Sequence, residues 1–341
     1  MEELDRRRVL TQERIVSLRE MLRDAEKLTT GKACVYATGS FGRGEANKNS
    51  DLDLFIVGLT NVSPASQGSM LNRLDEICVK ADLIEATRAL GIPEFDGDGR
   101  YLMHYSVQAF TGKLGTPDDD VTNTFTARLL LLLESRPLLE AGVYDEVTGE
   151  VVAAYWRDFE DHKNNFMPAF VANDILRMWR TFCVNYEART KREPDDKKIK
   201  GKIKNYKLKH SRLLTCYSAL LYFLEIYNRS GTVTPADAVA MIKLTPTERL
   251  EWLKGQPDLK GAESALDGLL VKYDRFLQTT SVNESELIGQ FSDKATASDF
   301  MTRAAEFGDL MYELKYPLIF MRDRTPRKRW RFGVGVLGIA R

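Results

Sequence analysis

The sequence has few of the residues that build disulfide scaffolds or zinc sites. It contains only four cysteines and three histidines in 341 residues. The cysteines show no CxxC spacing and the histidines are equally scattered along the chain (Cys34, Cys78, Cys183, Cys216; His104, His162, His210). This distribution excludes a disulfide framework, argues against a zinc site and favours reduced thiols in a cytosolic protein.

An excess of charge of one sign is also lacking, as are long apolar runs. Lys+Arg and Asp+Glu each number 49, so the formal net charge is zero. The whole molecule therefore has no bulk attraction for nucleic acid or an anionic membrane, and any such attraction must come from a local patch. The longest apolar run, Leu129 to Leu133, is far too short to span a bilayer, and the first residues lack a signal-peptide core. We expect a soluble, cytoplasmic protein without membrane contact.

What is present is an ordinary globular composition, with 43% hydrophobic and 29% charged residues. At roughly 150 residues per domain, the length favours two domains. The residue pattern predicts a helix over 2–28, strands at 33–37, 52–57 and 101–110, a helix over 68–90, and further helices at 129–139, 174–188, 211–227 and 299–314. The sequence therefore predicts an α+β fold, with an α/β domain at 1–120 and a mostly helical domain at 121–341.

Two carboxylates stand close together at the second predicted strand. Asp51 and Asp53 alternate with Leu52 and Leu54. Because alternate residues of a strand point to one face, the two acids lie side by side while the leucines face the core. Two adjacent carboxylates repel each other unless a cation lies between them. Hard oxygen ligands of this kind suit Mg²⁺ or Mn²⁺.

A glycine-rich loop precedes the acid pair, with the sequence Gly39-Ser40-Phe41-Gly42-Arg43-Gly44. Backbone N–H groups of such a loop can approach a phosphate, and Ser40 adds a hydroxyl donor. The loop is not a Walker P-loop, because GxxxxGK[ST] does not occur. A phosphate cradle beside paired carboxylates is the equipment of metal-assisted phosphoryl or nucleotidyl transfer.

The segment from Gly39 to Leu54 resembles a known signature. Its form, GSFGRGE…SDLDL, is similar to the hG[GS]…DhDh pattern of DNA polymerase β-like nucleotidyltransferases, especially bacterial members such as uridylyltransferases. The motif covers residues 39–54, and the order of predicted elements is similar over 1–120. The resemblance implies a small mixed-sheet catalytic core and a helical second lobe that completes a nucleotide cleft, but the signature does not fix the substrate.

The resemblance also implies three acids around two Mg²⁺ or Mn²⁺ ions, with a nucleoside triphosphate such as ATP as substrate. Asp51 and Asp53 match the first two acids. The third should come from a later strand, and its candidates are Asp98, which we favour, and Asp96. If this segment is only an Asp/Gly turn, the site lacks its third acid and fits a binding module instead.

Further candidates would hold the nucleotide. Gly39, Ser40 and Arg43 belong to the loop, and Lys209 and Ser211 lie at the start of a predicted helix of the second lobe. The run 191–212 holds ten basic and three acidic residues, and it either tracks an oligonucleotide or tRNA backbone or is simply solvated. Tyr206 and Tyr217 in this region fit core positions better than base stacking.

The acceptor is open at this stage. The size of the chain is similar to bacterial antiphage nucleotidyltransferases, which make cyclic or linear oligonucleotides. Nucleotidylation of tRNA or of a protein is also compatible with the sequence, and the basic run favours a polymeric product or an RNA acceptor. The rival from a different class is a non-catalytic nucleotide sensor on the same fold. A partner protein or a homo-oligomer is compatible as well.

Overall fold

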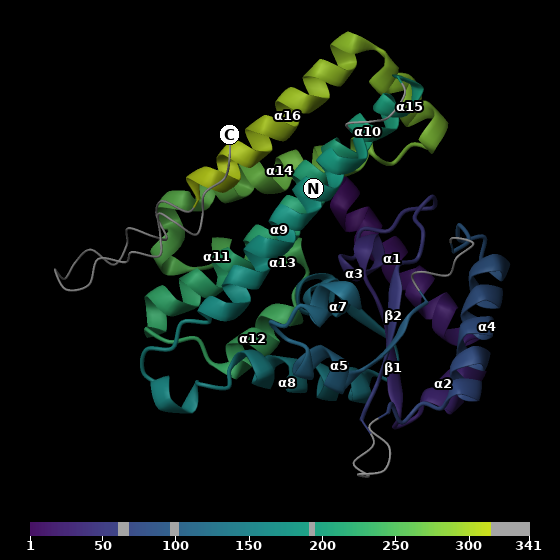
Figure 1. Ribbon diagram of the computed structural model, residues 1–341. Coiled ribbons are helices and arrows are strands. Elements are labelled where there is room, and N and C mark those ends of the chain that lie inside the picture. Colours follow the sequence, from purple (N-terminus) through teal and green to yellow (C-terminus); the bar gives the residue numbers. More distant parts are fainter. Residues whose placement is uncertain (61–67, 96–101, 191–194, 315–341) are drawn as a thin grey trace. The chain divides into compact units, whose positions relative to one another are not determined.

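The computed structural model describes residues 1–60, 68–95, 102–190 and 195–314 (Figure 1). The chain divides into two compact units, which we call the N-terminal unit (Glu2–Arg157) and the C-terminal unit (Asp158 onward). The sequence places the boundary at residue 120. The contacts divide the chain later because a strand and two helices after residue 120 pack with the N-terminal unit. Asp96, Asp98 and residues 191–194 lie outside the described residues.

The N-terminal unit mixes strands and helices. Its elements are α1 (Glu2–Met21), α2 (Arg23–Thr29), β1 (Ala33–Ala37), α3 (Gly39–Gly42), β2 (Leu54–Gly58), α4 (Arg73–Ala89), β3 (His104–Ser106), α5 (Val107–Gly112), α6 (Asp118–Val121), α7 (Thr124–Glu134), β4 (Arg136–Leu139) and α8 (Ala141–Tyr155). The strand predicted at 33–37 is confirmed. The helix predicted over 2–28 is divided into α1 and α2.

The described strands form one mixed sheet in the order β3-β2-β1-β4. β1 pairs antiparallel with both β2 and β4, whereas β2 pairs parallel with β3. The two central strands are buried along their whole length. The predicted α+β class with a small mixed sheet is therefore confirmed.

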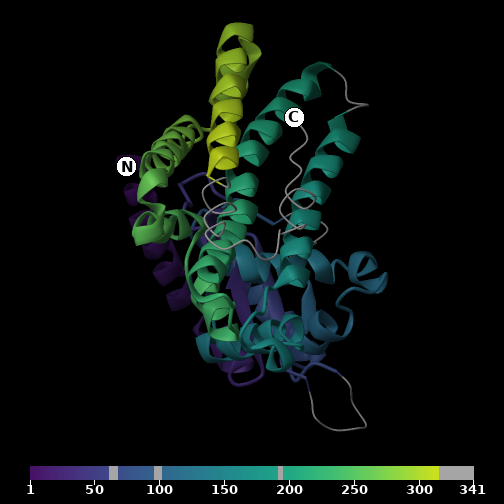
Figure 2. The same cartoon turned by 90° about the vertical axis from the view of Figure 1, so that its left-hand side faces the viewer.

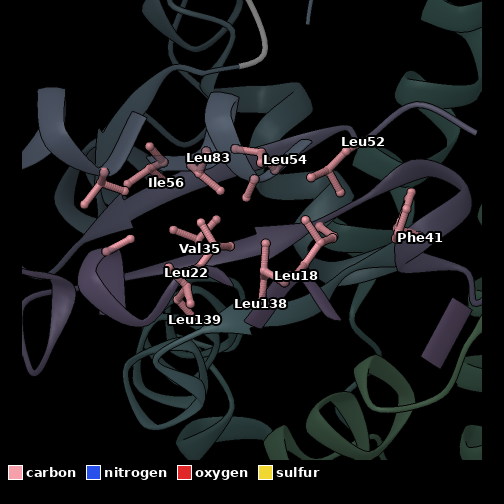
Figure 3. Close-up of a cluster of buried hydrophobic side chains, with 14 of the residues drawn as sticks. Leu18, Leu22, Val35, Phe41, Leu52, Leu54, Ile56, Leu83, Leu138 and Leu139 are labelled. Atoms are coloured by element: carbon pink, nitrogen blue, oxygen red, sulfur yellow. The ribbon is translucent and has the colours of Figure 1, made fainter. Parts of the chain in front are cut away.

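A hydrophobic core anchors the two strands that flank the motif (Figure 3). Val35 of β1 and Leu54 of β2 are fully buried, together with Leu18 of α1, Leu22 between α1 and α2, and Leu83 of α4. Phe41 of the glycine-rich loop belongs to the same cluster. Because full burial of one such side chain is worth about 1.5–3 kcal/mol, the core holds both ends of the motif firmly.

Two sequence predictions in this unit were wrong. Residue 101 of the strand predicted at 101–110 lies outside the described residues, and the rest is reduced to β3, because Ser106 caps α5 by accepting a hydrogen bond from Ala109 N–H. The helix predicted at 129–139 ends at Glu134, and the chain continues as β4. Pro137 disfavours a continuing helix, and it is tolerated in β4 because this strand lies at the edge of the sheet.

The regular elements in the described part of the C-terminal unit are all helices (Figure 2). Its elements are η1 (Glu160–His162), α9 (Ala169–Thr190), α10 (Asp195–Lys207), the π-helical turn η2 (Leu208–Arg212), α11 (Leu213–Ser230), α12 (Pro235–Ile242), α13 (Pro246–Lys254), η3 (Pro257–Ala262), α14 (Glu263–Thr279), α15 (Glu284–Ser292) and α16 (Lys294–Glu313). The helices predicted at 174–188, 211–227 and 299–314 correspond to α9, α11 and α16. None of the helices in the described part of the chain is long and apolar enough to cross a membrane.

Candidate active site

The glycine-rich loop and the acid pair meet at one edge of the sheet. Ala37, the last residue of β1, pairs with Leu54, the first residue of β2. The loop leaves β1 at the same edge where Asp53 enters β2. Thr38 N–H donates a hydrogen bond of 2.8 Å to the carbonyl oxygen of Asp53, and this bond holds the start of the loop beside the acid pair.

Gly39 lies directly against the carboxylate of Asp53. Its φ is +61°, which disfavours any residue with a Cβ. A Cβ added at Gly39 would lie 2.6 Å from Oδ2 of Asp53. The position therefore requires glycine for its backbone conformation and for the close approach of the loop to the carboxylate.

The two aspartates show the predicted alternation. Asp51 is exposed and Asp53 is partly buried, whereas Leu52 and Leu54 are buried. The acids precede β2 rather than lying inside it, because the strand begins at Leu54. Among the described residues, no His, Cys, Asp and Glu side chains form a cluster of three suited to a metal. The two acids would thus supply only part of a coordination sphere.

The rest of the loop folds into the short helix α3 instead of staying irregular. Gly42 N–H donates to Thr38 C=O, and Arg43 N–H donates to Gly39 C=O, both at 3.0 Å. Gly42 is packed tightly, since a Cβ there would lie 1.9 Å from the carbonyl oxygen of Glu134. The loop is thereby fixed against the end of α7.

Arg43 is held by two buried carboxylates. Its Nε donates to Oε2 of Glu45 at 2.8 Å, and its Nη1 donates to Oε2 of Glu134 at 2.9 Å. The guanidinium is almost fully buried, and buried charges require such pairing. This geometry favours a role in positioning the loop. Direct contact between Arg43 and a nucleotide stays a prediction.

Helix α1 clamps the segment that connects the loop to the acids. Thr11 Oγ1 accepts a hydrogen bond from Ala46 N–H at 2.8 Å, and Arg7 Nη1 donates to Glu45 C=O at 3.1 Å. Arg14 donates to the carbonyl oxygens of Asn47 and Ser50, and burial lowers its pKa. Sequence analysis missed these residues, although the i, i+4, i+7 spacing of positions 7, 11 and 14 on one helix face was visible.

Arg136 is a second residue near the loop that sequence analysis missed. It lies on β4 opposite Ala37. Gly44 has a φ of +71°, and a Cβ there would lie 2.9 Å from Nη2 of Arg136. The guanidinium therefore lies against the last glycine of the loop. No local pattern marks this residue, because its position depends on the pairing of β4 with β1.

Lys209 and Ser211 lie in the C-terminal unit, on the π-helical turn η2. Ser211 is buried, and its Oγ accepts a hydrogen bond of 3.3 Å from the hydroxyl of Tyr273. Lys209 is only partly buried and acts electrostatically on Cys183 of α9. Their participation in nucleotide binding stays a prediction.

The third acid also stays a prediction, because Asp96 and Asp98 lie outside the described residues. The described strand β3 follows them in the chain. β3 pairs with β2, the strand that Asp51 and Asp53 immediately precede.

Comparison with known families agrees with this arrangement. Residues 17–91 match the family model of a nucleotidyltransferase domain, a segment that includes the glycine-rich loop and the acid pair. The match is consistent with the polymerase β-like nucleotidyltransferase superfamily, whose domains typically use divalent metals. No curated protein and no solved structure matched the chain.

Proposed function

We propose that this chain is a metal-dependent, template-independent nucleotidyltransferase. It would transfer NMP or dNMP from a nucleoside triphosphate to a hydroxyl acceptor, with release of pyrophosphate. The observation that supports this best is the contact between Gly39 and the carboxylate of Asp53. It brings a phosphate-binding type of loop and a metal-binding type of acid to the same point.

The acid pair fits Mg²⁺ or Mn²⁺ in its chemistry. Mg²⁺ is usually bound by one or two carboxylates, several waters and substrate phosphates, and the exposed Asp51 and partly buried Asp53 are of the type that it binds. Asp51 and Asp53 would be ligands of two ions, with Asp98 or Asp96 as the third acid. When bound, such ions lower the pKa of an attacking hydroxyl and neutralise charge on the triphosphate.

The chain's own residues would bind and orient the nucleotide. Gly39 lets the loop backbone approach a phosphate, and Ser40, which is partly exposed, offers a hydroxyl donor. Arg43 fixes the loop through its two carboxylate partners.

Several acceptors fit this site. The product would be a cyclic or linear oligonucleotide, as in antiphage defence, with tRNA or a protein as the alternative acceptor. A non-catalytic sensor, which binds a nucleotide without transferring it, is the rival from another class. Release of pyrophosphate separates the sensor from the enzyme. We place the reaction in the cytoplasm.

The test is to incubate the purified protein with each labelled NTP and dNTP, with Mg²⁺ or Mn²⁺, and without added acceptor. We expect label in small products, in a ladder of oligomers or on the protein itself, together with pyrophosphate. Asp53→Asn should abolish transfer and keep the fold, whereas Asp145→Asn, at an exposed position of α8, should be as active as wild type. Robust transfer by Asp53→Asn would contradict the site. Nucleotide binding without any pyrophosphate release would favour the sensor.

A further inference from the structure

Three polar side chains from separate segments meet at the end of β2 that lies away from the acid pair. Nε2 of His104, on β3, lies 2.9 Å from Oγ of Ser69, which precedes α4. Nδ1 of the same ring lies 3.2 Å from Oε2 of Glu76, in the first turn of α4. Asp53 precedes the five residues of β2, so about 16 Å of strand separates this cluster from the candidate active site. The cluster is therefore a separate site.

The end of β2 brings the serine and the histidine together. Met70 N–H donates a hydrogen bond of 2.8 Å to the carbonyl oxygen of Leu59, which holds the segment of Ser69 beside the strand. Gly58, the last residue of β2, leaves the space that both side chains need. A Cβ there would lie 1.8 Å from Oγ of Ser69 and 3.1 Å from Nε2 of His104.

The carboxylate of Glu76 is held in its ionised form. Its Oε1 accepts hydrogen bonds from Arg73 and Lys80 of the same helix, and its Oε2 faces His104. Burial raises the pKa of this carboxyl, but hydrogen bonds from Lys80, His104 and Arg73 bring it down to about 2. At neutral pH the group carries a charge and can only accept hydrogen bonds.

These contacts determine where each proton lies. Because Glu76 can only accept, Nδ1 of His104 carries the ring proton. Burial lowers the pKa of His104 by more than Glu76 raises it, so the ring is neutral at pH 7 and Nε2 keeps a lone pair. Leu71 N–H donates to Oγ of Ser69 at 3.1 Å, which leaves the hydroxyl proton of Ser69 for Nε2.

This order of groups is that of an activated serine. A hydroxyl within hydrogen-bond reach of a base, which a third group orients, is the shared arrangement of nucleophilic active sites. Ser69 is partly exposed, whereas the side chains of His104 and Glu76 are only 10% and 8% exposed. A reagent can thus reach the hydroxyl while the base and its carboxylate stay shielded from water.

We propose that Ser69 is the nucleophile of a second reactive centre that hydrolyses esters, with His104 as its general base and Glu76 as a positioning residue. Oγ of Ser69 attacks the carbonyl carbon of the ester and passes its proton to Nε2 of His104. The C–O bond to the alcohol breaks, the alcohol leaves with this proton, and the acyl group stays on Ser69. Water then attacks the acyl group through the same base, which releases the carboxylic acid and returns the proton to Ser69. A Ser–His–acid arrangement supports this acyl chemistry without a cofactor.

The test treats the full chain with a fluorophosphonate probe, which labels activated serines, and with p-nitrophenyl acetate, without nucleotide or metal. Peptide mass spectrometry locates the label, and absorbance follows p-nitrophenol. We expect label on Ser69 and continuous hydrolysis of the ester, both lost in Ser69→Ala. Ser292 is an exposed serine whose Oγ donates to the carbonyl oxygen of Ile288 at 2.7 Å, so Ser292→Ala should behave as wild type.

His104→Asn tests the base with little change in shape. The asparagine amide can still donate to Glu76 in place of Nδ1, but no group replaces Nε2. A general base typically contributes about 10²–10⁴-fold, so labelling of Ser69 and ester hydrolysis should slow by that factor while the melting temperature stays close to that of wild type.

Glu76→Gln tests the positioning residue through the pH profile. The charged groups of α4 that act on His104 are Glu76, which raises its pKa, and Lys80 and Arg73, which lower it, and β2 carries no charged residue. The rate of labelling should rise with pH as His104 loses its proton. Without the carboxylate the pKa of His104 falls, so the midpoint of this rise should move to lower pH. A merely structural Glu76 would leave the midpoint unchanged.

Absence of label on Ser69 in the wild-type protein, or equal labelling of Ser69 and Ser292, overturns the proposal, whatever the variants do. Labelling of folded His104→Asn at the wild-type rate overturns it as well, because the hydrogen-bonded chain would then be structural only. Label on Ser69 with neither an acetylated serine nor ester hydrolysis overturns the assignment to acyl groups.

Discussion

Replacing Gly39 by alanine tests whether the contact between loop and carboxylate organises the site. The new Cβ would lie 2.6 Å from Oδ2 of Asp53, so the carboxylate or the loop must shift by about 0.5 Å or more to reach an ordinary contact. The positive φ of Gly39 adds a backbone cost of about 1–2 kcal/mol for a residue with a Cβ. The variant should therefore lose stability and also displace a proposed metal ligand.

The chain offers a matched control for this change. Gly31 has a φ of +65°, close to that of Gly39, but a Cβ there would meet no atom within 4 Å. Gly31→Ala should lose the same 1–2 kcal/mol, roughly, in free energy of unfolding, because the backbone penalty is shared. It should leave the site untouched.

The assays are urea unfolding, Mn²⁺ binding by calorimetry and pyrophosphate release. Because misplacement by about 1 Å can cost 10²-fold in rate, we expect kcat/KM of Gly39→Ala to fall by about that factor. Its Mn²⁺ affinity should fall as well, whereas Gly31→Ala should match wild type in both. If Gly39→Ala binds Mn²⁺ and transfers nucleotide like Gly31→Ala, the contact does not organise the site.

Three further predictions concern stability. Glu225 is fully buried, neither carboxylate oxygen has a hydrogen-bond partner among the described residues, and burial, then Asp258, raise its pKa from 4.5 to about 7. The folded state thus binds the proton more tightly, so stability should fall by up to about 3 kcal/mol as the pH rises from about 4.5 to about 7. Glu225→Gln should remove this fall in urea unfolding at pH 5 and 8, and an unchanged difference between the two pH values would refute it. Asp119→Ala breaks a buried bidentate ion pair with Arg128 (2.9 and 2.6 Å) and should lower the free energy of unfolding by about 3–5 kcal/mol. Asp119→Leu/Arg128→Met should lower it less, because no charge is left buried without its partner. Equal losses in urea unfolding would show that the unpaired charge is not the cause. Thr11→Val should lower the free energy of unfolding by about 1–3 kcal/mol, because Ala46 N–H loses its hydrogen-bond acceptor. If the variant unfolds in urea with the same free energy as wild type, this hydrogen bond does not stabilise the fold.

Local patterns revealed the centre of the candidate site but not its surroundings. The alternation of Asp51 with Leu52 and the glycines before it are short-range signals, and the structure brings them together through the pairing of β1 with β2. β4 was missed because its leucines continue a helical run and its pairing partner lies about a hundred residues earlier in the chain. The strand is defined by that distant partner, which no local window contains.

The partners and exposure of charged side chains were the features that the sequence predicted least well. Arg43 resembles a phosphate ligand in sequence, but Glu134, 91 residues away, forms an ion pair with it. Lys209 and Ser211 are neighbours in sequence, yet the first is partly exposed and the second is buried against Tyr273. A count of charges along the chain likewise does not show that Lys200 forms an ion pair with Glu284, because this partner lies on another helix.

The hydrogen bonds from α1 to residues 45–50 limit how far this domain can be shortened or transferred to another protein. The family match begins at residue 17, but Arg7, Thr11 and Arg14 all lie before it. A fragment cut to the matched segment would keep both motifs and lose the three side chains that hold residues 45–50 in place. The smallest piece expected to work as an autonomous catalyst, or as a donor for grafting into another scaffold, therefore begins upstream of Arg7.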